Sequence, residues 1–220
     1  MTRRTAIRLT SLSAAATLCQ QFSNSQILKS SNSRPLFNGR DLEGWSWVDN
    51  EGFRVEDGMI RTQGVKGMLW YHEKIGNAKL RVVYKMSAPN GNSGIFIRIP
   101  NEPKAERDAI HYGIEVQIDD RDDDWHCTGV LYSMTKALAR PSKPAGEWNT
   151  MEITLDGLRT IVHVNGVKVT DYDGVSPVPE RTKSYEPERR PRPESGYIGI
   201  QNHDERAVLY FKEISVAPLR

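Results

Sequence analysis

Apolar residues occupy every second position in short runs over most of the chain beyond residue 35. The clearest runs are KLRVVYKM (79–86), SGIFIRI (93–99) and YGIEVQI (112–118), and Gly, Pro, Asn and Asp separate such runs at short intervals. A period of two is typical of β-strands that bury one face. No segment of useful length shows the period of an amphipathic helix, so the pattern predicts an all-β protein.

Two segments carry the strongest hairpin signal in the chain. FRVEDGMIRT (53–62) and IVHVNGVKVTDY (161–172) place Asp-Gly or Asn-Gly between β-rich arms, as two-residue hairpin turns require. Many short antiparallel strands joined by turns indicate two packed sheets or a barrel. One core-facing side per strand favours the sandwich, and we predict a two-sheet antiparallel jelly roll.

Two longer segments, 100–109 and 174–195, interrupt the strand pattern and are expected to be irregular. The second is dense in proline and charge, which excludes a regular ladder. The simpler interpretation is a solvated surface loop. The alternative is a rim over a binding groove, in which Arg189, Arg190 or Arg192 touches a ligand.

Strand alternation also predicts which side chains avoid the core, because successive side chains point to opposite faces. Ile114, Val116 and Ile118 are expected to face inward. The same reasoning sends Ile95, Ile97, Ile99, Ile198 and Ile200 inward. The side chains left on the opposite face are Glu115, Gln117, Asp119, Phe96, Arg98, Gln201 and His203.

These outward groups combine a carboxylate, carboxamides, a guanidinium, an imidazole and an aromatic ring, which is the mixture that sugar ligands need. The alternative is an ordinary solvated sheet face. Gln, Asn and His form strands poorly, so their presence favours a site. Trp70, Trp125 and Trp148 are either further sugar platforms or core residues.

A metal site is the next candidate. The acidic run DDRDDDWH (119–126) has the carboxylates that calcium takes, but its spacing matches no ordered calcium loop, and a solvated loop is favoured. His111, His126 and His163 are not spaced as metal ligands. No cofactor is therefore certain, and a divalent metal such as calcium stays a hypothesis.

Chain length and charge limit the number of domains and the classes of partner. The length of 220 residues suits one domain, which we place at 35–220. The formal net charge of +2 includes five basic and no acidic residues among the first 34, so the body of the chain is mildly acidic. Such a body lacks the basic surface that nucleic-acid binding needs.

The N-terminal segment MTRRTAIRLTSLSAAATLC (1–19) resembles a twin-arginine export signal, with paired arginines, a short apolar run and small residues. A disordered basic tail is the alternative. The run is too short to span a bilayer. Residues 20–34 are expected to form a flexible linker, and the protein is expected to be periplasmic or secreted.

Cysteine content fits this interpretation. Leu18 stands where a lipoprotein signal needs a small residue, so lipid attachment at Cys19 is not expected. Once the signal is removed, Cys127 is the only cysteine left, and an intrachain disulfide is excluded.

Eight motifs in order resemble the 3-keto-disaccharide hydrolase family from about residue 35 to 219: LFNGRDLEGW, FRVEDGMI, GNSGIFIRI, YGIEVQIDD, TGVLY, GEWNTMEI, VNGVKVTDYD and GYIGIQNH. The resemblance implies a concanavalin A-like lectin/glucanase fold and export. It also implies cleavage of glycosides that carry a ketone at carbon 3. The ketone acidifies the proton on carbon 2, so a base removes it, the glycosidic oxygen departs, and water adds.

The resemblance implies site roles as well. Glu115 would be the base or a ligand to a divalent metal, and Gln117 and Asn92 would orient sugar hydroxyls. Arg98 or His203 would stabilise the oxyanion. Tyr132 would either protonate the leaving group or serve as a buried hydroxyl. An Asp is common in the family where Asn202 stands and a Gly where Asp204 stands, which leaves the loop geometry around His203 open.

Three functions remain open on the sequence. The first is an exported enzyme that cleaves 3-keto-glycosides, and the second is a non-catalytic carbohydrate-binding module. The third, a classical glycosidase, needs two carboxylates. Laminarinase-like relatives carry Glu-x-Asp-x-Glu on one strand, whereas this chain has Glu115, Gln117 and Asp119, which argues against the third.

Overall fold

The structure is a computed structural model that describes residues 32–203 and 208–219. The expected export signal, most of the expected linker, Cys19 and Asp204 lie outside the described residues. Among the described residues, no helix is long and apolar enough to cross a membrane.

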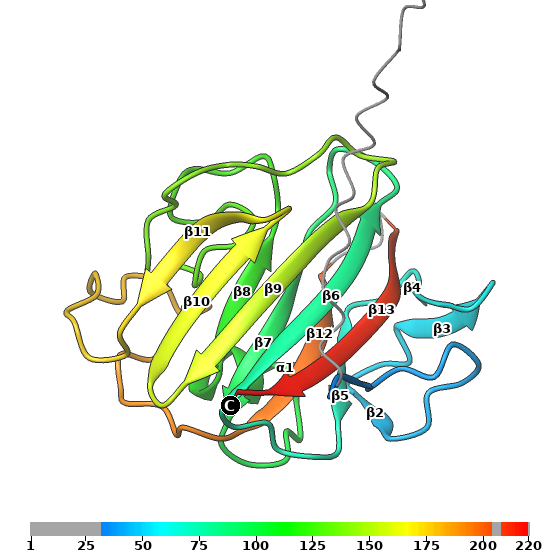
Figure 1. Cartoon of the computed structure of the whole chain (residues 1–220), viewed down its shortest axis with the longest axis horizontal. Helices are drawn as coiled ribbons and strands as arrows, with labels where there is room; N and C mark the ends of the chain where they lie inside the picture. The colour runs from blue at the N-terminus through cyan, green and yellow to red at the C-terminus, as the bar shows by residue number, and fades with distance from the viewer. Residues whose placement is uncertain (1–31, 204–207, 220) are drawn as a thin grey trace, which may run out of the picture.

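Two antiparallel sheets pack face to face, as the alternation predicted (Figure 1). The larger sheet has the order β11 (Val167–Tyr172), β10 (Arg159–Val164), β9 (Asn149–Asp156), β6 (Ala78–Met86), β13 (Leu209–Pro218), β4 (Met59–Thr62) and β3 (Phe53–Glu56), with β1 (Arg34–Pro35) beside β13. The smaller sheet has the order β2 (Trp45–Val48), β5 (Gly67–Tyr71), β12 (Tyr197–Asn202), β7 (Ser93–Ile99) and β8 (Ile114–Ile118).

Both predicted hairpins are confirmed. β3 pairs with β4, and β10 pairs with β11. Asp57 and Gly58 both adopt positive φ, as do Asn165 and Gly166. Two consecutive left-handed residues define the tight turn whose twist matches that of antiparallel strands, and Asn-Gly and Asp-Gly are the pairs that tolerate it best.

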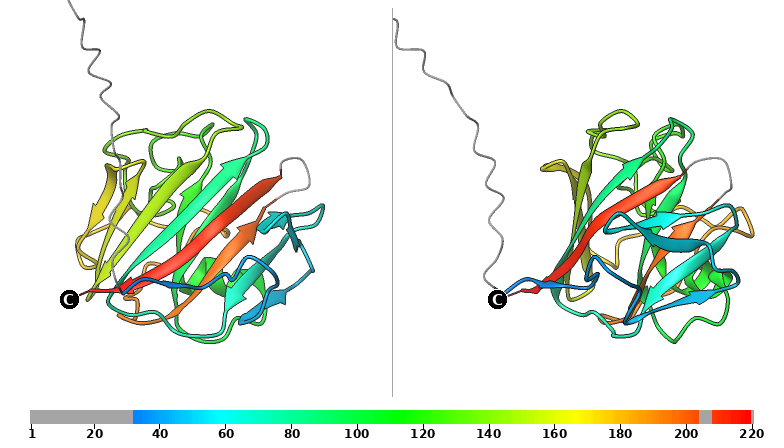
Figure 2. Two further views of the ribbon diagram at one scale, coloured as in Figure 1. Left: turned by 45° about the vertical axis from the view of Figure 1, so that its right-hand side comes forward. Right: turned by 90° about the vertical axis from the view of Figure 1, so that its right-hand side faces the viewer.

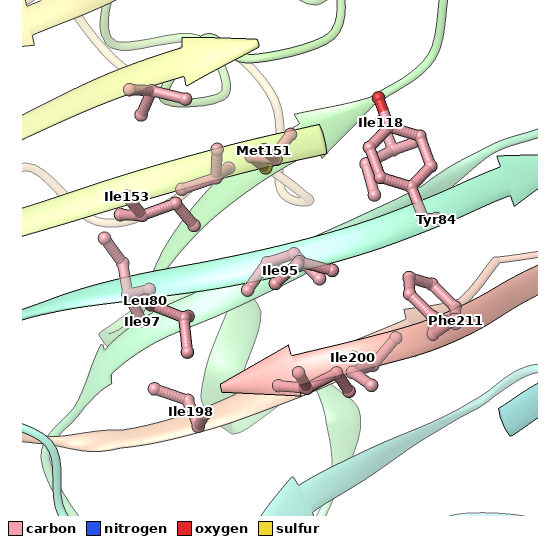
Figure 3. Packing of buried hydrophobic residues seen from close by; sticks show 14 of the residues in the cluster. Leu80, Tyr84, Ile95, Ile97, Ile118, Met151, Ile153, Ile198, Ile200 and Phe211 are labelled. Carbon is pink, nitrogen blue, oxygen red and sulfur yellow. The ribbon is translucent and has the colours of Figure 1, made fainter. Parts of the chain in front are cut away.

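The core lies between the two sheets, where alternating side chains of both inner faces meet (Figure 3). Strand β8 contributes Ile114, Val116 and Ile118, as predicted. From the smaller sheet Ile95, Ile97, Ile198 and Ile200 also join this core, and they face Leu80, Tyr84, Met151, Ile153 and Phe211 of the larger sheet. The outward direction of Glu115 and Gln117 follows from this packing.

One helix, α1 (Glu106–Tyr112), begins inside the segment that we expected to be irregular. It packs on the outer face of the smaller sheet, where Met68, Trp70, Phe96, Ile99 and Ala109 form a second apolar cluster. Figure 2 shows α1 beside the smaller sheet, on the side away from the larger one. The prediction that 100–109 is irregular throughout was therefore wrong. A helix of two turns is too short for its period to be recognised in the sequence.

Strand β7 departs from simple alternation at Arg98. This residue has a φ of 56°, and the pairing of β7 with β12 shifts register beside it. A bulge of this kind moves all later side chains to the other face. Ile99 therefore joins the outer cluster, although we predicted it to face the core. The predicted outward direction of Arg98 is also wrong.

Candidate active site

A cavity of about 400 Å³ opens on the outer face of the smaller sheet, beside α1. Strands β8 and β12 provide part of its wall, and α1 and several loops close the rest. The lining residues are Lys66, Asn92, Glu106, Ile110, Glu115, Gln117, Tyr132, Tyr185, Gln201 and His203. Its volume and its polar wall suit a small polar ligand.

Most residues that the sequence indicated meet in this cavity, although they come from separate parts of the chain. Glu115 and Gln117 come from β8, and Gln201 comes from β12. Asn92, Tyr132 and His203 complete the predicted set. Tyr132 is held beside β8, because its backbone N–H donates to the carbonyl oxygen of Glu115 at 2.9 Å.

Arg98 is not part of the cavity. Its side chain is 1% exposed and donates hydrogen bonds to the carbonyl oxygens of Pro193, Glu194 and Arg159 at 3.0 to 3.1 Å. The bulge has turned it toward strand β10 of the opposite sheet. Arg98 therefore fastens the loop before β12, and the expected oxyanion role is wrong.

Phe96 and Asp119 also lie outside the cavity wall. Phe96 points to the predicted face, but α1 covers that part of the sheet and leaves the ring 0% exposed. Asp119 follows the end of β8, where alternation stops. Its carboxylate accepts hydrogen bonds from the backbone and guanidinium of Arg121, and its side chain stabilises that turn. Their predicted contacts with substrate are therefore wrong.

The three tryptophans are not sugar platforms in this cavity. Trp70 packs in the second apolar cluster with α1. The Nζ atoms of Lys85 and Lys212 lie over the ring of Trp148, at 4.9 and 4.2 Å from its centroid. Trp125 is half-buried, and like the other two it is not among the lining residues.

Glu115 is a half-buried residue of β8 and the only ionisable residue of that strand. Strand β7 accommodates it through Gly94, because a Cβ atom on Gly94 would overlap Glu115 Oε1 and lie 2.6 Å from Glu115 Cγ. Burial raises the pKa of Glu115 to about 8, with a smaller contribution from the negative charge of Glu106. Both causes disfavour the ionised form.

Glu106 is the main site residue that the sequence analysis missed. It lies in the first turn of α1, and burial raises the pKa of its carboxyl group. A side-chain hydrogen bond with Gln201 and the charge of Lys66 oppose that rise. The sequence signal that could have indicated this helix is weak. It consists of the apolar pair Ala109 and Ile110, three and four residues after Glu106, which is the spacing of one helix face.

Lys66, also missed, lies at the end of a loop that a single buried amide secures. Asn202 Nδ2 donates to the carbonyl oxygens of Gly52, Gln63 and Val65, at 2.6 to 3.2 Å. A carboxylate has no hydrogen to donate. Asn at position 202 therefore holds the loop that ends at Lys66, and an Asp there, which the resemblance noted in the sequence led us to consider, could not donate these bonds.

Several cavity atoms are hydrogen-bond acceptors. Asn92 Oδ1 and Gln201 Oε1 are buried and have no hydrogen-bond partner among the described residues. A buried acceptor without a partner costs stability. Ligand hydroxyl groups would satisfy both atoms, whereas Lys66 and His203 add nitrogen donors to the same wall.

The long loop at 174–195 borders the cavity through Tyr185, whose side chain is 57% exposed. Its arginines hold the loop in place. Arg192 donates to the carbonyl oxygens of Gly113 and His111 at the end of α1, and Arg189 donates to that of Ser133. The loop is thus a rim, but none of the arginines that we considered lines the cavity.

Among the described residues, one group of side chains is spaced to hold a metal ion: Asp122, Asp123 and His126. It lies in the acidic run, and both aspartates are exposed. Both ring nitrogens of His126 are already engaged, one with Asp123 at 2.7 Å and the other with Ser133 at 3.0 Å. A divalent metal therefore stays a hypothesis.

Comparison with known proteins connects this arrangement to carbohydrate chemistry. Residues 32–217 match a protein family described as the 3-keto-alpha-glucoside-1,2-lyase-like domain. No curated protein matches the chain significantly.

Solved structures with the same fold include two proteins from Parabacteroides distasonis that are provisionally assigned as glycosyl hydrolases. One has a TM-score of 0.73 at 24% identity and covers 89% of this chain and 98% of its own. The other has a TM-score of 0.70 at 26% identity, with 85% and 99% covered. The carbohydrate-binding module CBM66 from Bacillus subtilis has a TM-score of 0.52 at 13% identity, with 78% and 93% covered.

Proposed function

The chain belongs to the 3-keto-alpha-glucoside-1,2-lyase-like family, and we propose that its cavity cleaves 3-keto-glycosides by removing the proton beside the ketone. The observation that carries this proposal is the placement of Glu115 in a polar cavity where its pKa is about 8. A general base acts best when its pKa is close to the working pH. The N-terminal pattern supports a periplasmic or secreted location.

The reaction needs one general base and a stabilised enolate. The carboxylate of Glu115 takes the proton from carbon 2, and the electron pair moves toward the ketone oxygen. The bond between carbon 1 and the glycosidic oxygen then breaks, and the departing oxygen takes a proton. Water adds to carbon 1, and carbon 2 recovers its proton from Glu115, so the base returns to its starting state.

Other cavity residues fit the remaining tasks. The buried acceptors on Asn92 and Gln201 suit sugar hydroxyls. Lys66 and His203 replace Arg98 as candidates to stabilise the enolate oxygen. Burial raises the pKa of Tyr132 above its ordinary value, so its phenol keeps its hydrogen and can protonate the departing oxygen.

Two alternatives have support from the molecule and its relatives. Glu106 and Glu115 share one cavity, and a classical glycosidase also uses two carboxyl groups. The fold is shared with a carbohydrate-binding module, and a sugar-binding cavity need not be catalytic. The proposed reaction and the two alternatives predict different outcomes when a 3-keto-glucoside and its unoxidised parent are compared.

The test uses a 3-keto-glucoside with a chromogenic aglycone and its unoxidised parent. We expect release of the aglycone from the ketone alone. Release from both compounds would support the classical glycosidase, and binding without release would support the binding module. Repeating the assay with a chelator tests a divalent metal, because a carboxylate such as Glu115 is also a suitable metal ligand.

The pH dependence of this release is a further prediction. Because Glu115 must be ionised to act as a base and its pKa is about 8, kcat/KM should rise with pH and level off above that value. Two pH units below the pKa, only about 1% of the base is ionised, so the rate should be about 100-fold lower there. Initial rates in overlapping buffers, corrected for spontaneous release, check this. A flat profile between pH 5 and pH 8 would contradict the assignment.

A further inference from the structure

The cavity holds a second carboxyl group, that of Glu106. It has no role in the removal of the carbon 2 proton, which Glu115 performs. Glu106 reaches the cavity from α1, whereas Glu115 reaches it from strand β8. We propose that Glu106 activates the water that adds to carbon 1, so that this enzyme completes hydrolysis and does not release an unsaturated sugar. This inference rests on the proposed function and specifies its second half.

The position of Glu106 is fixed by its surroundings. Its backbone N–H donates to Asp49 Oδ2 at 2.7 Å, which attaches the start of α1 to the loop after β2. Asp108 Oδ2 accepts hydrogen bonds from the backbone N–H groups of Lys104 and Ala105, at 2.9 and 3.1 Å. A catalytic group on a held element keeps its geometry, which is what water activation requires.

The charges around the two carboxyl groups suit different roles. Gln201 and Lys66 favour the ionised form of Glu106 and partly offset its burial. Glu115 is shifted by burial and by the charge of Glu106, and nothing opposes that shift. Glu115 therefore holds the proton from carbon 2 until it returns it to that carbon. During this time Glu106 is the group that takes a proton from water.

The complete cycle balances. Glu115 takes the proton of carbon 2, the bond between carbon 1 and the glycosidic oxygen breaks, and the phenol of Tyr132 gives its proton to that oxygen. Water then forms a bond to carbon 1 and gives a proton to Glu106, while Glu115 returns its proton to carbon 2. Glu106 then gives its proton to solvent and Tyr132 takes one from solvent, so all three side chains are regenerated and the net reaction consumes one water.

The test follows both products of a chromogenic 3-keto-glucoside. The aglycone is measured by its colour, and the sugar by mass spectrometry, which separates the hydrated 3-keto-sugar from the unsaturated product that weighs one water less. With Glu106→Gln we expect the aglycone to be released within about tenfold of the wild-type rate. Formation of the hydrated sugar should fall about 100-fold, and the unsaturated product should accumulate.

Glu102→Gln is the matched control, because Glu102 is exposed just before α1 and outside the cavity wall. It should leave the product ratio unchanged. The inference is overturned if Glu106→Gln still forms the hydrated sugar at the wild-type rate, or if the wild type releases only the unsaturated product. If the wild type releases no aglycone from the ketone, the proposed function itself fails, which is a different result.

Discussion

Replacement of Glu115 by glutamine is expected to slow aglycone release from a 3-keto-glucoside by about 1000-fold, which is within the usual contribution of a general base. Glutamine keeps the size of the side chain and removes its basicity. The measurement is kcat/KM at pH 8 for the wild type and the variant, after subtraction of spontaneous release. Retention of more than about a tenth of the wild-type rate would exclude Glu115 as the base.

The stability of the same variant shows whether it folds. The folded-state pKa of Glu115 is about 8, above its ordinary value of 4.5. Between these values the unfolded chain gives up its proton first, so the wild type loses stability as pH rises through this window. Glu115→Gln does not titrate there, and its melting temperature should exceed that of the wild type increasingly toward pH 8.

Glu152→Gln is the control for this comparison, because Glu152 lies on β9 of the larger sheet and is not part of the cavity wall. It should change neither activity nor the pH dependence of melting. A Glu115→Gln protein that melts below the wild type throughout would show that its lost activity reflects damaged folding.

Replacement of Gly94 by alanine is expected to reduce activity about 100-fold, although no ionisable residue is replaced. The new Cβ would overlap Glu115 Oε1 and lie 2.6 Å from Glu115 Cγ, so the carboxylate must rotate away from its place. Displacement of a catalytic group by about 1 Å can cost about 100-fold in rate. Steady-state kinetics should show the loss mainly in kcat, because the groups that bind the sugar hydroxyls stay in place.

Gly76→Ala is the matched control for this substitution. A Cβ atom on Gly76 would lie 3.4 Å from Ser195 Cβ, an ordinary contact outside the cavity. Its activity should equal that of the wild type. If Gly94→Ala is equally active, the carboxylate of Glu115 either does not need its present position or is not the base.

Much of this site could be predicted because side-chain alternation is a local property. Ile114, Val116 and Ile118 pack in the core, and the direction of Glu115 and Gln117 follows from them. The same argument places Gln201 correctly from Ile198 and Ile200. The predicted directions of Glu115, Gln117 and Gln201 are correct because no bulge or strand end comes before them in β8 or β12.

Arg98 and Asp119 show where the local argument stops. The left-handed backbone at Arg98 turns the next side chain of β7, Ile99, to the opposite face of the sheet. Asp119 lies one position beyond the end of β8, where the ladder no longer sets its direction. Neither a bulge nor the exact end of a strand leaves a clear mark in a single sequence.

The sequence alone determined the all-β class, both hairpin turns and the strand faces that carry Glu115, Gln117 and Gln201, because each depends on residues a few positions apart. Only the tertiary structure decided that α1 covers Phe96, that Glu106 and Lys66 enter the cavity, and that Arg98 leaves it. Those outcomes depend on contacts between segments far apart in the chain, where packing outweighs local preference.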